Sequence, residues 1–507
     1  MANKLATLGK QILGFTSGTC CAVPAAEAVT APAPESRAVK VGEGGKLEAY
    51  PVAIIGAGPV GLAAAAHLVA RGERPIVFEA GSAVGAHVAA WSHVQVFSPW
   101  RYNVDEIAAK LLRASGWAEP DPDTLPTGGE LIARYLRPLT ALPELAPHIR
   151  LNARTTQITR AGYDKMKTAG RDTVPFALRV RGADGHESTV LARAVIDASG
   201  TWSTPNPLGA DGMPADGEAA ARERIVYGIP APLGPDRERY AARRVLVVGS
   251  GHSAFNVLLD LIALADVSPA TRITWAIRRT DVGQMYGGAA ADALPARGQL
   301  GVRVQAAVAT DRVQLVTNFR TASVRRSHDG VSVIGVDGVV LGPFDEIIAA
   351  TGFRPDLALT QELRLDLDPT VESPRALAPL IDPNVHSCGT VRPHGVDELS
   401  HPEPGFYVLG MKSYGRAPTF LMLTGYEQVR SVVAALAGDL EAARRVELTL
   451  PETGVCSSTA GSQCSTDMPG AASCCDSEPV VVAIAPVKAG ALCANDSETL
   501  VQPPGRV

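Results

Sequence analysis

Two glycine-rich loops, each placed between an apolar run and a helical pattern, constrain this sequence more than any other feature. The first loop, GAGPVG at residues 56–61, follows the strand-like run 52–55. The second loop, GSGHSA at residues 249–254, follows the run 244–248. A glycine loop between a strand and a helix holds the pyrophosphate of a dinucleotide at the helix N-terminus. One such loop is weak evidence, but two predict a chain that binds two dinucleotides and passes electrons between them.

Each position of the two loops has its own predicted task. Gly56 permits the tight turn, Gly58 lets the backbone approach a pyrophosphate, and Gly61 lets the helix pack against the strand, with Pro59 between them. The second loop repeats this design with alanine in place of the third glycine. Its predicted dinucleotide contacts are Gly249, Gly251, His252, Ser253 and Ala254.

The residues that follow the next strand of each unit distinguish the two dinucleotides. The run 75–78 ends in Glu79, a carboxylate that can accept both ribose hydroxyls and would repel a 2′-phosphate. The run 273–277 ends instead in Arg278 and Arg279, whose guanidinium groups can bind a 2′-phosphate. The sequence therefore predicts FAD at the first loop and NADPH at the second.

Composition and charge indicate an ordinary globular enzyme. The 507 residues are 46% hydrophobic and 20% charged, which allows two or three domains with sizeable cores. A net charge of −5 without a Lys/Arg run gives no reason to expect nucleic acid. The uncharged stretch 49–70 resembles a membrane span, but its glycines and proline fall where a phosphate loop needs them. We therefore expect a cytoplasmic protein without a membrane segment.

The order of these units predicts an α/β fold with two Rossmann-like dinucleotide-binding domains. Two apolar runs that enter small-residue turns, 195–201 and 347–355, are interpreted as crossovers between the domains, and Thr351 and Gly352 are predicted to contact a cofactor. The predicted FAD domain is discontinuous (51–209 and 346–450), with the NADPH domain (210–345) inserted. Residues 1–50 and 451–507 are predicted to be a flexible arm and a disordered, cysteine-containing tail.

Together the loops, Glu79, the arginine pair and the segment 350–352 resemble the class B flavin-dependent monooxygenases. This resemblance implies that NADPH reduces FAD, and that reduced flavin and dioxygen form a peroxyflavin that oxidises a small, soft nucleophilic substrate. It also implies that the stretch 97–103, which follows Trp91, faces the flavin, with Trp100 among the cofactor contacts and Asn103 or Gln95 bonded to the adduct. The chain departs from the family at 225–232, where the usual histidine-containing signature is missing.

The cysteines are concentrated near the two ends of the chain. None of the eight forms a Cys-x-x-Cys pair, which counts against a redox dithiol and a zinc site. With its cysteine-rich ends, the pattern most resembles the flavin monooxygenases of bacterial arsenic-resistance operons. The adjacent pairs Cys20-Cys21 and Cys474-Cys475 are either thiolate ligands for trivalent arsenic or incidental thiols, and the sequence leaves both open. A disulfide oxidoreductase and a metalloid-binding carrier are the alternative functions, and the oligomeric state is left open.

Overall fold

The structure is a computed structural model, and it describes residues 46–448 apart from 281, 284, 288–291, 293, 386–390 and 419. These residues belong to the first of two compact units, Met1–Ser458; the second is Thr459–Val507. All eight cysteines lie outside the described residues, as do the predicted tail and nearly all of the predicted arm.

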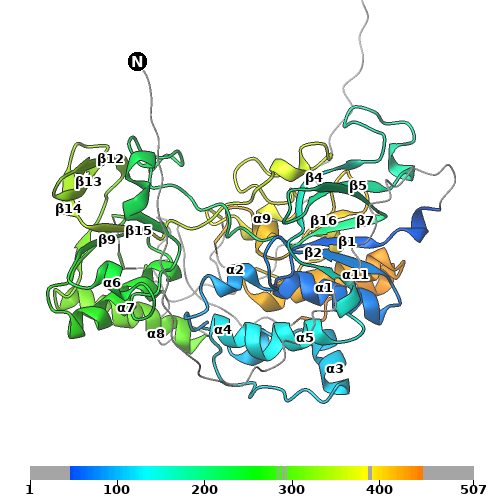
Figure 1. Cartoon of the computed structure of the whole chain (residues 1–507), viewed down its shortest axis with the longest axis horizontal. Coiled ribbons are helices and arrows are strands. Elements are labelled where there is room, and N and C mark those ends of the chain that lie inside the picture. The colour runs from blue at the N-terminus through cyan, green and yellow to red at the C-terminus, as the bar shows by residue number, and fades with distance from the viewer. Residues whose placement is uncertain are drawn as a thin grey trace, which may run out of the picture. The chain divides into compact units, whose positions relative to one another are not determined.

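A five-stranded parallel sheet forms the centre of the first half of the fold (Figure 1). In spatial order its strands are β16 (Phe406–Val408), β7 (Ala194–Asp197), β1 (Val52–Ile55), β2 (Pro75–Phe78) and β3 (Ile149–Arg150). The first glycine loop joins β1 to helix α1 (Pro59–Ala70), which packs against α11 (Met422–Leu436). The loop therefore lies at the carboxyl end of the central strand, where parallel sheets bind ligands.

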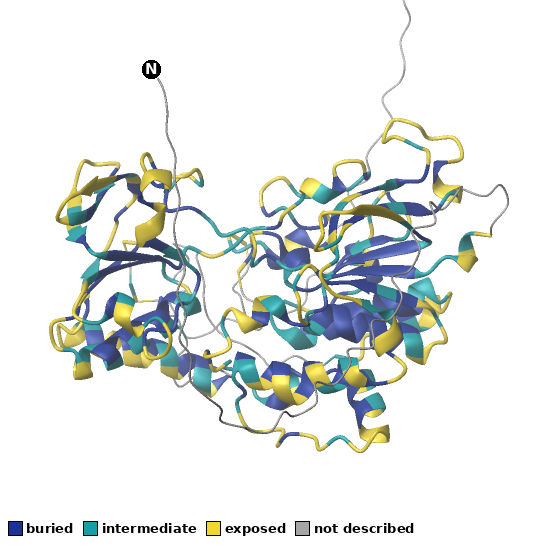
Figure 2. Cartoon of the chain, in the orientation of Figure 1, coloured by how far each residue is buried: buried dark blue, intermediate teal, exposed yellow. Residues whose placement is uncertain are grey.

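Burial on both faces explains why β1 is an uninterrupted apolar run. Val52 and Ile54 pack into the core that contains α1 and α11. Ala53 and Ile55 point to the opposite face, where they pack against an antiparallel sheet. That sheet consists of β4 (Arg154–Arg160), β5 (Phe176–Arg181) and β6 (Glu187–Ala192). A strand covered on both sides has no polar face, so its sequence does not alternate (Figure 2).

The second half repeats this plan. Its parallel sheet has the order β11 (Gln314–Val316), β10 (Arg272–Ala276), β9 (Arg244–Val248), β15 (Glu346–Ala349) and β8 (Ile225–Tyr227). Helices α7 (His252–Val267) and α8 (Pro295–Ala309) pack on one face of it. The antiparallel strands β12 (Thr321–Ser327), β13 (Gly330–Gly335) and β14 (Val340–Phe344) pack on the other. The predicted α/β class with two Rossmann-like halves is confirmed.

The two crossover segments run side by side. Pro205 and Phe353 form an antiparallel bridge, and the Asn206 amide donates to Gly352 O at 2.9 Å. The indole of Trp202 stacks on the Phe353 ring at 4.5 Å. The predicted boundary at residue 346 is corrected by the sheet pairing. Strand β15 pairs with β9 and β8 in the second sheet, so the chain crosses back only after residue 349.

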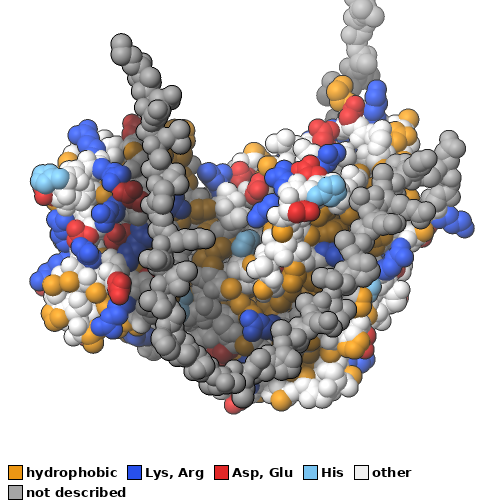
Figure 3. Space-filling model, in the orientation of Figure 1, with side chains coloured by type: hydrophobic (Ala, Val, Ile, Leu, Met, Phe, Trp, Pro, Cys, Tyr) orange, Lys and Arg blue, Asp and Glu red, His pale blue; other side chains and the backbone are white. Residues whose placement is uncertain are grey.

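The long uncharged stretch at the first loop is buried within the fold. The α1 side chains from Val60 to Leu68 are buried, including His67, which pairs with Asp105 at 3.0 Å. In the described part of the chain, every helix is too short or too polar to cross a bilayer. On the face seen in Figure 3, Lys and Arg side chains are interspersed with Asp and Glu.

Candidate functional site

The glycines of the first loop divide into two that the fold requires and one that it does not. Gly56 has a φ of +98°, and a Cβ there would lie 2.8 Å from Ala198 O. A Cβ on Gly61 would lie 2.0 Å from Gly56 O, so helix and turn could not close. At Gly58, by contrast, a Cβ would meet no protein atom within 4 Å. The protein itself does not need a glycine at 58, and the open space is available to a ligand.

Glu79 connects the end of β2 to the first loop. Its side chain is buried, with Oε2 accepting from the Ala57 amide at 2.8 Å and Oε1 from the Gly81 amide at 2.7 Å. Each carboxylate oxygen can accept more than one hydrogen bond, so both keep capacity for a ribose hydroxyl. The backbone donors thus fix the carboxylate in place at the border of the main cavity.

The second loop repeats this division of its glycines. Gly249 has a φ of +131°, and a Cβ there would lie 2.1 Å from Ala350 O. The Gly249 carbonyl accepts from the Trp275 indole at 2.6 Å, and the buried Ala254 packs in the core. Gly251 resembles Gly58, because a Cβ there would meet nothing within 4 Å.

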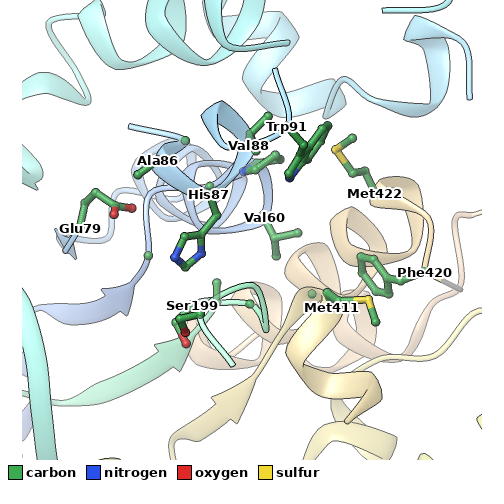
Figure 4. A pocket seen from close by; sticks show the side chains of 18 of the residues that line it. Val60, Glu79, Ala86, His87, Val88, Trp91, Ser199, Met411, Phe420 and Met422 are labelled. Atoms are coloured by element: carbon green, nitrogen blue, oxygen red, sulfur yellow. The ribbon is translucent and has the colours of Figure 1, made fainter. Parts of the chain in front are cut away.

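One cavity of about 470 Å³ lies against both loops. From the first half, Gly56, Gly58, Pro59 and Glu79 line it. From the second half, Ile229, His252, Ser253 and Asn256 line it. Figure 4 shows Glu79 on one side of the cavity, and Trp91, Met411, Phe420 and Met422 on the other, around Val60. The cavity thus combines one carboxylate and glycine amides with a largely apolar wall, as a dinucleotide with a fused-ring system requires.

His252 opens helix α7 beside aromatic rings. Its imidazole lies 5.1 Å from the Phe97 ring and 6.1 Å from the Phe255 ring, measured between centroids. Burial lowers the pKa of His252 to about 4, with a smaller contribution from the Arg297 charge, against which Asp292 acts. The imidazole is therefore neutral near pH 7, so His252 presents a neutral ring to the cavity.

The stretch from Trp91 to Asn103 borders the cavity, and Asn103 itself lines it. Both Asn103 amide hydrogens are used within the loop, on Ser98 O (2.7 Å) and Pro99 O (2.8 Å). Asn103 therefore shapes the loop and has no donor left for a bound oxygen species. Trp100 is buried in the core and does not line the cavity. Gln95 lines the cavity and donates only to Leu125 O, at 3.3 Å.

The remaining predicted contacts lie away from the main cavity. Arg278 and Arg279 are exposed just past β10, and Arg278 Nη1 donates to Ala210 O at 3.2 Å. Thr351 lies in the crossover, where its hydroxyl donates to Asn206 O at 2.6 Å. Gly352 is beside it with a φ of +86°. Both arginine side chains are thus exposed beyond the end of β10, whereas the Thr351 hydroxyl is occupied within the crossover.

Sequence reasoning missed a buried ionic network beneath the cavity. Lys412 Nζ lies 2.7 Å from Asp197 Oδ2, and the two side chains are 1% and 0% exposed. Ser199 donates its hydroxyl to Asp197 Oδ1 at 2.6 Å and accepts from Lys412 Nζ at 3.1 Å. Ser199 itself lines the cavity (Figure 4). Asp197 ends an apolar strand, so the sequence itself marks it as a buried acid, but nothing in the sequence indicates that Lys412 is its partner.

The family model of the pyridine nucleotide-disulphide oxidoreductases matches residues 50–401, which include both loops and both parallel sheets apart from β16. The chain belongs to this family. Members of this family are flavoproteins that use FAD and NAD(P)H, and the predictions of FAD and of a nicotinamide dinucleotide are confirmed at this level.

The individual proteins that resemble this chain match it at sequence identities of 30% or less. Indole-3-pyruvate monooxygenase YUCCA1 of Oryza sativa subsp. japonica is 30% identical over 216 residues, which span 41% of this chain and 44% of that protein. The bacillithiol disulfide reductase Bdr of Bacillus cereus superposes with a TM-score of 0.56 at 18% identity, over 77% of this chain and 99% of that one. The ornithine N-hydroxylase of Kutzneria sp. 744 superposes with a TM-score of 0.51 at 16% identity, over 77% of this chain and 99% of that one. These two structures share the fold.

Proposed function

We propose that this chain is an NADPH-dependent flavin monooxygenase, with FAD at the first loop and NADPH at the second. The observation that carries the proposal is that one cavity is bordered by both loops, through Gly58 on one side and His252 and Ser253 on the other. Two dinucleotides bound there would bring their reactive ends into the same space. The likeness to a plant monooxygenase supports this choice within the family.

The residues present fit an FAD molecule. Gly58 leaves room for a pyrophosphate, Glu79 offers a fixed acceptor for ribose hydroxyls, and the apolar wall around Val60 suits a ring system. Bound there, FAD would supply hydride acceptance and activation of dioxygen. One oxygen atom would pass to the substrate and the other would leave as water, with NADPH as the electron donor.

The chain's own part in this reaction is to position the reactants and to exclude water. Trp91, Met411, Phe420 and Met422 offer hydrocarbon, aromatic and thioether surface, which does not hold ordered water. The neutral imidazole of His252 adds no charge to that wall. A dry cavity favours oxygen transfer to a soft nucleophile over release of hydrogen peroxide.

The proposed substrates are small molecules with a soft lone pair on sulfur, nitrogen or trivalent arsenic. Arsenicals belong in this group because Cys20-Cys21 and Cys474-Cys475 are soft ligand pairs, although they lie outside the described residues. The decisive experiment measures NADPH oxidised, oxygen consumed, oxygenated product and hydrogen peroxide for a thioether, an amine, indole-3-pyruvate and methylarsenite. We expect one product per NADPH with at least one of them. Quantitative release of hydrogen peroxide with every compound would refute the proposal.

A matched pair of variants tests where the two dinucleotides bind. Gly58→Ala and Gly251→Ala each add a methyl group that meets no protein atom at a helix N-cap, so any loss of thermal stability without ligands should be small and similar in the two variants. We expect Gly58→Ala to lower the bound FAD content, and Gly251→Ala to raise KM for NADPH while FAD stays bound. The reverse pattern, or no effect of either, would contradict the assignment of the loops.

Disulfide reduction is the second candidate function, because the family and the Bdr fold both point to it. No cysteine is found among the described residues that line the cavity, and the full sequence has no Cys-x-x-Cys. Disulfide-dependent oxidation of NADPH without oxygen, with two thiols formed per NADPH, would establish this function instead.

A further inference from the structure

A second cavity of about 200 Å³ lies beside the first. It is enclosed by the segment 93–97, by Leu125, and by helices α7 and α8. Four consecutive residues, 94–97, and Asn256 line both cavities, so only this thin wall separates them. A molecule held in the second cavity would therefore lie next to the proposed reaction site.

Two opposite charges in the second cavity have no partner among the residues that the structure describes. Asp260 of α7 is half-buried, and its carboxylate forms no hydrogen bond or ion pair with any described residue. Arg303 of α8 is exposed and is equally unpaired. Near the start of α8 the fold does pair such groups, since Asp292 and Arg297 are 2.8 Å apart and buried. Asp260 and Arg303 thus present opposite charges to one cavity, and no described residue pairs with either, so both are available to a ligand.

The neutral side chains around Asp260 offer acceptors. Asn256, one helical turn before Asp260, donates its amide to His252 O at 2.9 Å, and its carbonyl oxygen accepts no hydrogen bond from a described residue. Gln95 likewise donates its side-chain amide to Leu125 O, and its side-chain carbonyl oxygen accepts no hydrogen bond from a described residue. Three side-chain acceptors therefore line one cavity, as an ammonium group with three donors requires. Arg303 lines the same cavity and has no hydrogen bond or ion pair with Asp260, so a cation and a carboxylate face one space without contacting each other.

We propose that the second cavity binds the ammonium and carboxylate groups of a zwitterionic amino-acid substrate. The ammonium group would lie against Asp260 and the two amide carbonyls, and the carboxylate against Arg303. A purely anionic ligand would face Asp260, and a purely cationic ligand would leave Arg303 unused. The role as a substrate site rests on the proposed function, but binding itself requires neither NADPH nor oxygen.

The test is calorimetric titration of the flavin-loaded full chain, without NADPH, using three matched probes. L-Norleucine carries both charged groups, hexanoate only the carboxylate and pentylamine only the ammonium. We expect norleucine to bind at least about tenfold more tightly than either, because each charge-assisted contact adds roughly that factor. Equal affinities for the three probes would overturn the proposal.

Two substitutions assign the contacts. Asp260→Asn should abolish the tighter binding of norleucine relative to hexanoate, because the ammonium group loses its charged partner. Arg303→Gln should abolish the tighter binding of norleucine relative to pentylamine, because the carboxylate loses its partner. Asp266→Asn, an exposed site on the same helix paired with Arg312, is the control and should leave all three affinities unchanged. Unaltered norleucine binding in both test variants would refute the site. Norleucine binding together with failed oxygen transfer would refute only the monooxygenase function, so the two failures are distinguishable.

Discussion

Replacing Lys412 by methionine should destabilise the protein strongly, because it leaves a buried charge without its partner. Asp197 is 0% exposed, and Lys412 supplies its only cationic contact among the described residues, at 2.7 Å. After the change, only the amide and hydroxyl of Ser199 would still donate to the carboxylate. Breaking a buried ion pair in this way costs about 3–5 kcal/mol.

The double substitution Lys412→Met with Asp197→Asn separates the charge from the packing. Asparagine keeps the shape and a carbonyl acceptor for Ser199 but needs no counter-ion. We therefore expect the double variant to be more stable than Lys412→Met alone by at least about 1 kcal/mol. Urea unfolding followed by tryptophan fluorescence and circular dichroism measures both differences. A loss below about 1 kcal/mol for Lys412→Met, or a double variant less stable than the single one, would refute this reasoning.

Three further predictions concern the nucleotide sites and pH. Glu79→Gln should weaken FAD binding by about tenfold, seen as flavin lost on dialysis, because a charged acceptor becomes a neutral one; full flavin retention would contradict its role. Arg278→Ala with Arg279→Ala should weaken NADPH use by about 1–3 kcal/mol and spare NADH, and equal losses would contradict the phosphate contact. The lowered pKa of His252 means that the unfolded chain takes up this proton first, so the free energy of unfolding should fall, by up to about 3 kcal/mol, as pH drops from 6.5 to about 4. His252→Gln should flatten that slope in urea titrations, and an unchanged slope would exclude His252 as its source.

Local patterns predicted the parts of the fold that depend on neighbouring residues. The strand, glycine turn and helix at each loop form within a short segment, so the sequence shows them directly. The strand β15 was recognised as an apolar run entering a turn, but its sheet was assigned wrongly. Its place depends on pairing with β9, which is remote in the chain and leaves no local signal.

The orientation of the side chains between Trp91 and Asn103 was equally invisible in the sequence. Asn103 lines the cavity and Trp100 is buried in the core, and this difference depends on the turn there, where Asn103 bonds to the backbone at Ser98 and Pro99. The Asp197–Lys412 pair and the cavity beside Asp260 join residues from separate elements. Contacts of this kind become visible only when the packing of the elements is known.

The interrupted order of the first sheet has a consequence for how the nascent protein acquires its structure. Strand β16 completes that sheet beside β7, yet the ribosome makes it only after every strand of the second sheet. All strands of the second half, from β8 to β15, are encoded in one continuous stretch, so they can pair before β16 is synthesised. We therefore expect chains truncated before residue 406 to retain protease resistance in the later portion and to lose it in the earlier one.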